Sequence, residues 1–447
     1  LPCLYRANDD TGFGAARRSW KPDVDGQGLE YGGSPGRRGQ SRRSRKAMAD
    51  LKMIDVGPAS MDPAPDVASS SGSAPRRLLH VFPGFGVGGV EFRIAAIINR
   101  LGRRFSHTII GLDGVYDARS RLDADADVSF PFTRPWPKEN PALAALGARR
   151  VLARLGPDLL LTYNWGAVDW ALANRFVPVC RHVHFESGFG SPEEAHMRRR
   201  ILLRRLALGR AERIIVPSLR LARLMTDEWR LPATKIHYIP NGVDLTLFGE
   251  APDPSAIPQL ARHPGAFVVG TVTSLRREKN LERMIRVFAA AAEGRDAVLL
   301  LVGDGAERPA LERYARERGV DRVLFAGFVA APHRVIGLMD IYAISSDTEQ
   351  MPNALVQAMA AGRPVVATDV GDIKHIVAEP NRPFVVDPAE ESALAACLGR
   401  LMDDVAERRR LGAANRARAA ERFDIRAMTE AYRAVFDGSP LPPAAAP

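Results

Sequence analysis

The sequence contains little cysteine and no long apolar run. Its three cysteines, Cys3, Cys180 and Cys397, lie far apart in a chain of 447 residues, so they indicate neither a disulfide framework nor a zinc site. No stretch reaches the ~18 consecutive apolar residues of a membrane-spanning helix, and the first residues lack the pattern of a signal peptide. We therefore expect a chain that works in the reducing cytoplasm.

The first 76 residues have a composition that does not favour folding. They are rich in Gly, Ser, Pro and Arg, as in GGSPGRRGQSRRSRK, and cannot bury enough apolar surface for a core. We expect residues 1–76 to be a disordered basic segment and residues 438–447 a disordered tail. A basic arm that binds nucleic acid is one interpretation of residues 1–76. We favour upstream translated or non-native sequence, because the chain begins with Leu1 and holds Met48 and Met53 inside this segment.

From residue 77 onward, short aliphatic and β-branched runs alternate with helical patterns of about ten residues or more. The alternation restarts after IPNGVD, residues 239–244. Such a pattern is typical of parallel sheets built from βαβ units. We predict an α/β fold with two doubly wound, Rossmann-like domains, residues 77–240 and 241–422, facing across a cleft. A last helix is expected at residues 423–437.

A glycine-rich loop follows the first apolar run. Gly84, Gly86 and Gly89 spell G-x-G-x-x-G after residues 78–82, and Asp113 closes the next run. This arrangement is found in dinucleotide-binding enzymes, where helix N–H groups hold a pyrophosphate. An oxidoreductase would leave the second series of strands and helices unexplained, so we disfavour it.

The most informative segment is residues 345–371, SSDTEQMPNALVQAMAAGRPVVATDVG. Pro352 suits the first turn of a helix and Gly362 suits its end, while Glu349 lies on the loop before it. The N-terminus of such a helix can hold a phosphate through backbone N–H groups and the helix dipole. An ordinary βαβ unit would explain the helix but not the polar cluster that precedes it.

This segment resembles the family 4 glycosyltransferases, retaining enzymes with the GT-B architecture. Glu349 and Gln357 fall on the two positions of the family's Glu-x7-Glu signature, and AMAAGRPVVAT follows at residues 358–368. The resemblance implies that Glu349 faces the donor sugar and that Gln357 contacts the ribose. An amide accepts a hydroxyl hydrogen without the charge-assisted strength of a carboxylate, so weaker donor binding is expected.

Further matches to the family lie along the second series. Lys279 in SLRREKN matches a lysine that grips the diphosphate, while its partner arginine falls on Ser274, so Arg276 or Arg277 would supply the charge. The resemblance assigns the donor phosphates and sugar to Gly88, Gly89, Lys279, Arg277, Met351, Pro352 and Asn353, and the nucleoside to Gln357, Gly303, Gly305 and Gly327.

Two matches lie in the first series. Gly88 and Gly89 open a G-G-x-E pattern that ends at Glu91, which is also an acid favoured by the dipole at a helix start. PVCRHVHFESGFG, residues 178–190, resembles the region from which a family histidine contacts the donor sugar, which makes His184 a catalytic candidate beside Glu349. A structural histidine remains an alternative, and a zinc site at His182 and His184 lacks further ligands.

Two charged stretches have competing interpretations. LDADADV, residues 122–128, would place three aspartates on one face of an extended segment, as in metal-binding Asp-x-Asp pairs, but we interpret them as solvated surface. Residues 198–213, RRRILLRRLALGRAER, form either a basic helix on an anionic membrane, with contact through residues 198–210, or an amphipathic helix with its leucines in the core. No aromatic stacking platform accompanies these arginines, so we expect no nucleic-acid partner.

Together these features predict a retaining glycosyltransferase that moves a sugar from a nucleotide-sugar donor to a glycan or lipid-linked acceptor in polysaccharide, lipopolysaccharide or glycolipid biosynthesis. We expect no metal and no cofactor, and a cytoplasmic location that extends to the inner face of the membrane. A nucleotide-sugar epimerase of the same fold and a non-catalytic sugar-nucleotide-binding scaffold are the alternatives. The scaffold is suggested by Gln357 and Ser274 in place of the family's charged residues.

Overall fold

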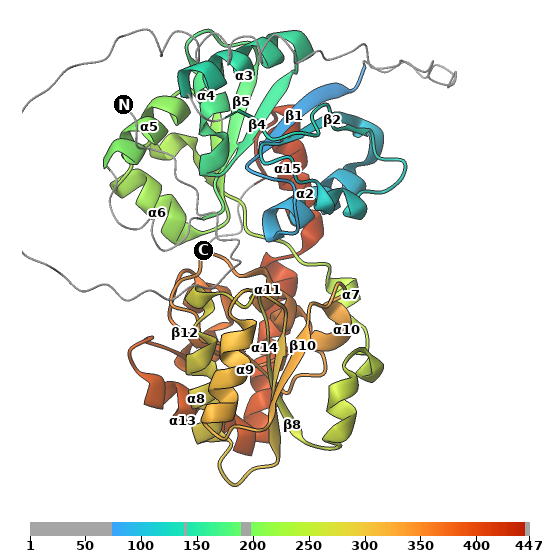
Figure 1. Cartoon of the computed structure of the whole chain (residues 1–447), viewed down its shortest axis with the longest axis vertical. Coiled ribbons are helices and arrows are strands. Elements are labelled where there is room, and N and C mark those ends of the chain that lie inside the picture. Colours follow the sequence, from blue (N-terminus) through green and yellow to red (C-terminus); the bar gives the residue numbers. More distant parts are fainter. Residues whose placement is uncertain (1–73, 138–140, 189–197, 443–447) are drawn as a thin grey trace, which may run out of the picture. The chain divides into compact units, whose positions relative to one another are not determined.

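The computed structural model of the chain describes residues 74–137, 141–188 and 198–442. The predictions of disorder for residues 1–76 and 438–447 lie outside the described residues at positions 1–73 and 443–447, whereas residues 74–76 and 438–442 are described and Arg76 begins the first strand. Residues 74–136 and 148–442 belong to one compact unit. They form two α/β domains, each built on a parallel sheet, as the sequence pattern predicts (Figure 1). None of the helices in this described part is both long and apolar enough to cross a membrane.

The first sheet has seven parallel strands in the order β3-β2-β1-β4-β5-β6-β7. Its strands are β1 Arg76–Phe82, β2 Phe105–Gly111, β3 Val128–Ser129, β4 Leu159–Tyr163, β5 Arg181–Phe185, β6 Arg213–Val216 and β7 Ile236–Tyr238. Its helices are α2 Gly89–Leu101, α3 Pro141–Leu155, α4 Val168–Arg175, α5 Arg198–Leu208 and α6 Leu219–Asp227. The helix predicted at residues 198–213 thus ends at Leu208, where Gly209 follows.

The second sheet has six strands in the order β10-β9-β8-β11-β12-β13, again all parallel. Its strands are β8 Phe267–Val272, β9 Ala297–Val302, β10 Val323–Gly327, β11 Ile341–Ile344, β12 Val365–Thr368 and β13 Val385–Val386. The helices are α7 Leu245–Gly249, α8 Leu281–Ala291, α9 Arg308–Glu317, α10 His333–Ile336, α11 Asn353–Ala360, α12 Ile373–Ile376, α13 Glu391–Asp403 and α14 Val405–Arg422.

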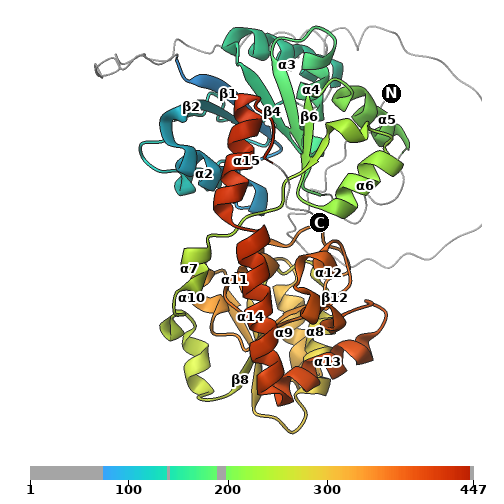
Figure 2. The same cartoon turned by 180° about the vertical axis from the view of Figure 1, so that it is seen from behind.

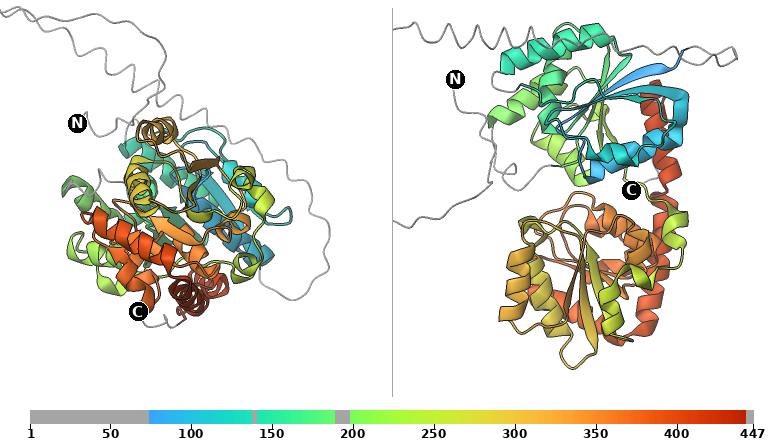
Figure 3. Two further views of the ribbon diagram at one scale, coloured as in Figure 1. Left: turned by 90° about the horizontal axis from the view of Figure 1, so that it is seen from below. Right: turned by 45° about the vertical axis from the view of Figure 1, so that its right-hand side comes forward.

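Helices cover both faces of the second sheet (Figures 2 and 3). One apolar cluster joins Leu299 and Leu301 of β9 to α8, α9 and α13, while Val298 and Leu300 of the same strand face a second cluster with α10, α11 and α12. Successive strand side chains point to opposite faces, so both faces of a strand of this kind must be apolar. The continuous run AVLLLV in β9 is the sequence sign of that double burial.

The last described helix, α15, spans Ile425–Asp437, within the range predicted for a last helix. It follows α14, which ends at Arg422, and Asp424 caps its first turn. The side chains that α15 buries join the core of the first sheet: Met428, Ala431, Tyr432, Val435 and Phe436. The last described helix is therefore part of the first domain's core although it follows the second domain in sequence.

Both sheets reverse their strand order at one strand. β1 pairs with β2 on one side and β4 on the other, and β8 likewise pairs with β9 and β11. Loops that leave two neighbouring strands at such a point diverge to opposite faces, so ligands of open α/β sheets bind beyond the carboxyl ends there. The loops after β8 and β11 carry Lys279 and Glu349, two of the predicted site residues.

A cluster of buried polar rings lies inside the first domain. His80 Nδ1 lies 2.9 Å from the Tyr163 hydroxyl and His80 Nε2 lies 3.0 Å from His107 Nδ1, and Phe436 packs edge-on to the His80 ring. Burial lowers the pKa of His107 to about 4 and holds the pKa of His80 well below its usual range. The core therefore contains neutral imidazoles.

These buried imidazoles should make the protein sensitive to acid. The folded pKa lies below that of the unfolded chain, so between pH ~6.5 and ~4 the unfolded chain binds more protons and acid favours unfolding. Each such histidine contributes about 1.4 kcal/mol per pH unit in this window. We expect His107→Gln to lower the pH dependence of the unfolding free energy by about that amount, measured by urea unfolding at several pH values.

The matched control is His375→Gln, on the exposed side of α12. It should leave the pH dependence of wild type unchanged. If the unfolding free energies of His107→Gln and wild type depended equally on pH, His107 would not be the buried neutral histidine that we infer.

Candidate functional site

An ion pair joins the two loops at the switch point of the second sheet. Lys279 Nζ lies 2.6 Å from Glu349 Oε1, and the Ser346 hydroxyl donates to the same oxygen at 2.7 Å. Only 18% of the Lys279 side chain and 10% of the Glu349 side chain are exposed, so water screens the pair weakly. Both predicted residues thus lie together, beyond the carboxyl ends of β8 and β11.

Side-chain hydrogen bonds fix the two loops to each other. The Ser345 hydroxyl lies within 3.0 Å of the carbonyl oxygens of Lys279 and Asn280, and the Asn280 amide donates to the Asp347 carboxylate at 3.0 and 3.1 Å. Asn280 adopts a left-handed conformation, φ 44°, and its side chain caps α8 by accepting from Arg283 N–H at 3.2 Å. The loop that carries Lys279 is therefore positioned by side chains and not by the ion pair alone.

The start of α11 lies next to this pair in sequence. Pro352 is the N-cap of the helix and not, as predicted, a residue of its first turn. Gly362, with φ 70°, follows the C-cap residue Ala361. Asn241 contacts the same turn, because its amide donates to the Asn353 side chain at 2.6 Å and to the Met351 carbonyl at 3.2 Å. A Cβ added at Gly89 would lie 2.9 Å from Asn353 Nδ2. Gly89, Met351, Pro352 and Asn353 are thus brought together.

Three predicted nucleoside-binding glycines have packing roles of their own. Gly303, with φ 137°, has no room for a Cβ because the carbonyl oxygen of Thr273 occupies the space, and Gly305 is blocked by the carbonyl of Leu275 in the same way. Gly303 N–H donates to the carbonyl of Gly327 at 2.8 Å. The carboxyl ends of β9 and β10 and the loop after β8 therefore meet here, and nucleoside contact by these glycines stays a prediction.

The remaining donor-site candidates are less constrained. Gln357 is half-buried on α11, and Arg276 and Arg277 are exposed in the loop after β8. Ser274, which takes the place of the expected arginine, is half-buried. Exposed guanidinium groups two and three residues from Lys279 are free to move towards a phosphate.

In the first domain, Gly88 caps α2 in extended conformation, and the Glu91 carboxylate folds back over it. Burial raises the pKa of Glu91, and this effect outweighs its hydrogen bond to its own backbone N–H. Glu91 thus caps the helix but, unlike a solvated first-turn acid, it does so partly buried.

His184 lies in a buried polar row across β4 and β5. The Thr162 hydroxyl lies 2.8 Å from both His182 Nε2 and His184 Nδ1, and His184 Nε2 lies 3.6 Å from Glu186 Oε2. His184 has no exposed surface and Glu186 is 1% exposed. Burial, reinforced by His184, lowers the pKa of His182 to about 3. Sugar contact by His184 stays a prediction.

The aspartates of residues 122–128 are not on an extended segment, and that expectation is wrong. Asp123 to Ala126 form a turn with an Ala126 N–H to Asp123 carbonyl hydrogen bond of 3.1 Å. All three aspartates are exposed, in line with solvated surface. Over the described ranges, no group of three or more His, Cys, Asp or Glu side chains is arranged to hold a metal ion.

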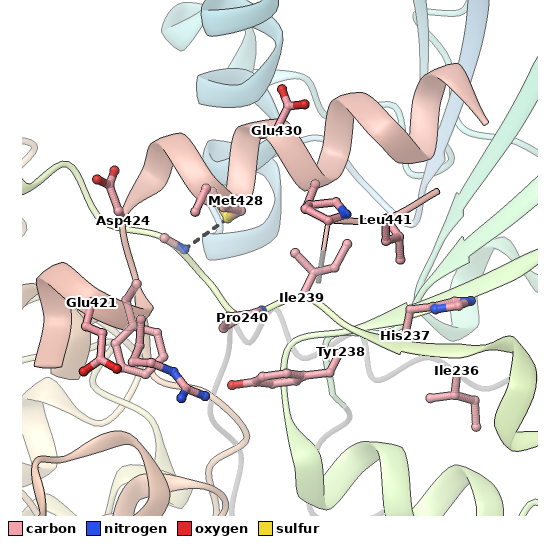
Figure 4. Close-up of a pocket in the computed structure, with 16 residues that line it drawn as sticks. Ile236, His237, Tyr238, Ile239, Pro240, Glu421, Asp424, Met428, Glu430 and Leu441 are labelled. Carbon is pink, nitrogen blue, oxygen red and sulfur yellow. Dashed lines mark hydrogen bonds between the residues drawn. The ribbon is translucent and has the colours of Figure 1, made fainter. Parts of the chain in front are cut away.

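A cavity of about 440 Å³ lies away from these residues (Figure 4). Its wall comes from β7 and the segment after it, the end of α14, the start of α15 and residues 441–442. Here the chain segments are held together by backbone hydrogen bonds between Val243 and both Phe423 and Ile425, at 2.7 and 3.0 Å. Gly242 N–H donates to the Met428 sulfur at 3.0 Å, the dashed line in Figure 4. None of the predicted site residues lines this cavity.

Comparison with known proteins agrees with this geometry. A family model described as Glycosyltransferase Family 4 matches residues 87–247, and one described as Glycosyl transferases group 1 matches residues 266–404. The chain is therefore similar to glycosyltransferases over both of its sheets. The two models cover the two domains separately, one match on each sheet.

Individual glycosyltransferases share a third or less of their aligned residues with this chain. The chain is 32% identical to the lipopolysaccharide core biosynthesis glycosyltransferase LpsD of Rhizobium meliloti over 41% of its length, and it spans about half, 53%, of LpsD. It is 25% identical to the putative glycosyltransferase EpsF of Bacillus subtilis, over 66% of this chain and 80% of EpsF. The structure of Anabaena Alr3699/HepE in complex with UDP superposes with a TM-score of 0.68 at 22% identity, covering 81% of this chain and 100% of HepE. That likeness shows the GT-B fold.

The sequence alone did not identify some residues of the candidate site. Ser346 lies three residues before Glu349 and orients its carboxylate, and Asn241 contacts the start of α11 from a distant part of the sequence. Glu186 follows His184 closely, but only the fold shows that its carboxylate is buried. The sequence signal for Ser346 was its place in the loop before Glu349, whereas Asn241 had none besides its glycine-flanked turn.

Gly371 supports the Glu349 loop and gives a direct test of the geometry. It has φ 61°, and an added Cβ would overlap the carbonyl oxygen of Glu349. We expect Gly371→Ala to lower the thermal unfolding temperature and to weaken nucleotide-sugar binding at least tenfold, because strain and overlap both displace the loop. Thermal shift and calorimetry measure the two effects.

The matched control is Gly399→Ala in α13, where an added Cβ has no neighbour within 4 Å. Alanine is favoured over glycine in a helix interior by about 0.5–1 kcal/mol, so this variant should be neutral or stabilised. A Gly371→Ala variant that behaves like Gly399→Ala would show that the Glu349 loop is not held in this way.

Proposed function

We propose that the protein is a retaining glycosyltransferase that transfers a sugar from a nucleoside diphosphate sugar to a hydroxyl of a glycan or lipid-linked acceptor. The observation that carries this proposal is the Lys279–Glu349 pair, 2.6 Å long, beside the start of α11. In the transfer, the bond between the anomeric carbon and the donor phosphate breaks and a bond to the acceptor oxygen forms. The acceptor proton leaves with the nucleoside diphosphate or passes to water.

Positive charge is needed where the nucleoside diphosphate departs. Lys279 and the N–H groups at the start of α11 supply it from fixed positions, and Arg277 adds a mobile guanidinium. The diphosphate would compete with Glu349 for Lys279 and so release the Glu349 carboxylate to accept sugar hydroxyls. With these groups in place the proposed reaction requires neither a metal nor a cofactor.

The relatives give a pathway class for the proposal. LpsD is described as acting in lipopolysaccharide core biosynthesis. We propose that this protein likewise builds a cell-surface polysaccharide, lipopolysaccharide or glycolipid, and that it acts on the cytoplasmic side of the membrane. A scaffold that binds the donor without turnover is the second candidate, because Gln357 and Ser274 remove charge from the donor site.

Donor consumption tests the proposal directly. We expect one of the UDP-, GDP- or ADP-sugars to raise the unfolding temperature and to be hydrolysed slowly with release of its nucleoside diphosphate. Glu349→Ala should lower turnover at least 100-fold, while Glu293→Ala, an exposed acid in the turn after α8, should have no effect. Stable binding without any turnover, in the presence of lipid-linked acceptor extracts, would favour the scaffold.

Gln357→Glu provides a gain-of-function test. A carboxylate accepts a ribose hydroxyl more strongly than an amide by about 1.4 kcal/mol, which corresponds to about tenfold in affinity. Donor binding should therefore tighten by about that factor in calorimetry. Unchanged or weaker binding would show that position 357 does not contact the ribose.

The first domain carries a surface that suits membrane contact. Leu202, Leu203 and Leu206 of α5 are 64%, 36% and 38% exposed, and Phe176 and Val177, after α4, are 69% and 59% exposed. α4 and α5 lie side by side (Figures 1 and 2). The interpretation that all the leucines face the core is therefore wrong for three of them.

Not every arginine of α5 is available to lipid. Arg204 is buried and lies between Trp165 and Trp229, with ring distances of 4.6 and 4.2 Å, whereas Arg205 and Arg210 are exposed. Exposed leucines beside exposed arginines match an anionic lipid surface, where apolar side chains enter the interface and guanidinium groups contact phosphate. We propose peripheral membrane binding through α5.

Vesicle binding tests this surface. The double variant Leu202→Ser/Leu206→Ser should lower binding to phosphatidylglycerol-containing vesicles at least fivefold. Burial of each leucine side chain in the lipid interface contributes up to about 1.5–3 kcal/mol, and serine removes that contribution. Leu247→Ser, at an equally exposed leucine of α7, is the control. Binding that is equal in both variants, or absent in wild type, would contradict the proposal.

A further inference from the structure

Glu186 is a buried carboxylate without a donor to satisfy it. It lies one residue beyond β5, is 1% exposed, and neither of its oxygens accepts a hydrogen bond from any described residue. A carboxylate taken out of water without hydrogen bonds costs several kcal/mol, so such a group needs a proton or a ligand that donates to it.

Its nearest titratable neighbour, His184, has one nitrogen bonded elsewhere. The Thr162 hydroxyl has one hydrogen, so it donates to one of His182 and His184 and accepts from the other. In both arrangements Nδ1 of His184 is bonded to Thr162, while Nε2 faces Glu186 Oε2 at 3.6 Å, beyond hydrogen-bond distance.

The two residues therefore differ in what they can offer to a sugar. His184 can offer only Nε2, because Nδ1 is bonded to Thr162. Glu186 has two oxygens with about four lone pairs, of which the His184 contact uses at most one. A pair of neighbouring sugar hydroxyls can donate to both oxygens of one carboxylate.

We propose that Glu186, and not His184, is the residue of this strand end that binds sugar hydroxyls, with His184 and Thr162 as its positioning residues. The inference rests on the proposed transferase function and assigns a binding residue within it. Glu186 lies at the carboxyl end of a parallel strand, the edge where open α/β sheets bind ligands. Because the carboxylate is buried, the Ser187–Gly188 turn that follows it must move when the sugar binds.

Glu186→Gln separates a binding role from a structural one. The substitution keeps the shape and removes an unpaired buried charge, so the unfolding temperature should stay the same or rise. Affinity for the free nucleoside diphosphate, which has no sugar, should stay within twofold of wild type. Turnover of the nucleotide sugar should fall at least tenfold. The control Glu212→Gln removes a half-exposed acid paired with Arg181, near the amino end of β6, and should keep full turnover.

Kinetic measurements on Glu186→Gln show whether the bound hydroxyls belong to the donor sugar or to the acceptor. If they belong to the donor sugar, the KM for the donor rises and slow donor hydrolysis falls with it. If they belong to the acceptor, donor hydrolysis is unchanged and only transfer to the acceptor is lost. His184→Asn should reduce turnover less than Glu186→Gln, because it acts through Glu186.

Two results would overturn the inference. A clear fall in the unfolding temperature of Glu186→Gln, together with weaker nucleoside diphosphate binding, would make Glu186 a structural residue. Wild-type turnover in Glu186→Gln would show that its oxygens bind no substrate. Failure of the transferase function itself is recognised separately, since wild-type protein would then consume no nucleotide sugar, while the unfolding temperature still reports on the structural role.

Discussion

The reversal of strand order at β8 is the constraint on which the candidate donor site depends. At this point the loops after β8 and β11 bring Lys279 and Glu349 together beyond the carboxyl ends of the strands. Hydrogen bonds from the Ser345 hydroxyl to the carbonyls of Lys279 and Asn280, and from the Asn280 amide to the Asp347 carboxylate, join the two loops before any ligand contributes. Catalysis by fixed charges requires such prior order, since a flexible lysine would have to be ordered during the reaction.

Glycines make this order possible by letting backbones approach closely. At Gly303, Gly305 and Gly371 a Cβ would overlap a carbonyl oxygen of a neighbouring loop, so the loops after β8, β9, β11 and β12 are packed backbone against backbone. Two of them, Gly303 and Gly305, also match family positions assigned to the nucleoside. Their packing role and a binding role are compatible, because a surface without side chains is also one that a flat base can approach.

The two acidic residues near the strand ends differ in their electrostatic state. Glu349 is paired with Lys279 and bonded by Ser346, so its charge is compensated within the protein. Glu186 lies 3.6 Å from His184 Nε2, and neither of its oxygens accepts a hydrogen bond from a described residue. Buried groups left unsatisfied by the fold reduce stability, and they persist where a ligand completes them. We infer that the two acids act differently. The diphosphate releases Glu349 from Lys279, whereas sugar hydroxyls donate to Glu186.

The sequence by itself determined the fold class and the two parallel sheets, because strand and helix periodicity are local properties, whereas Glu349 and Lys279 were proposed from the family resemblance. It could not determine that α15 completes the first core, that the aspartates of residues 122–128 form a turn, or that three leucines of α5 are exposed. Those facts depend on which elements pack together. The Lys279–Glu349 distance, the contact of Asn241 with α11 and the unsatisfied state of Glu186 were likewise decided only by tertiary structure, since each joins residues whose separation in space the local pattern does not encode.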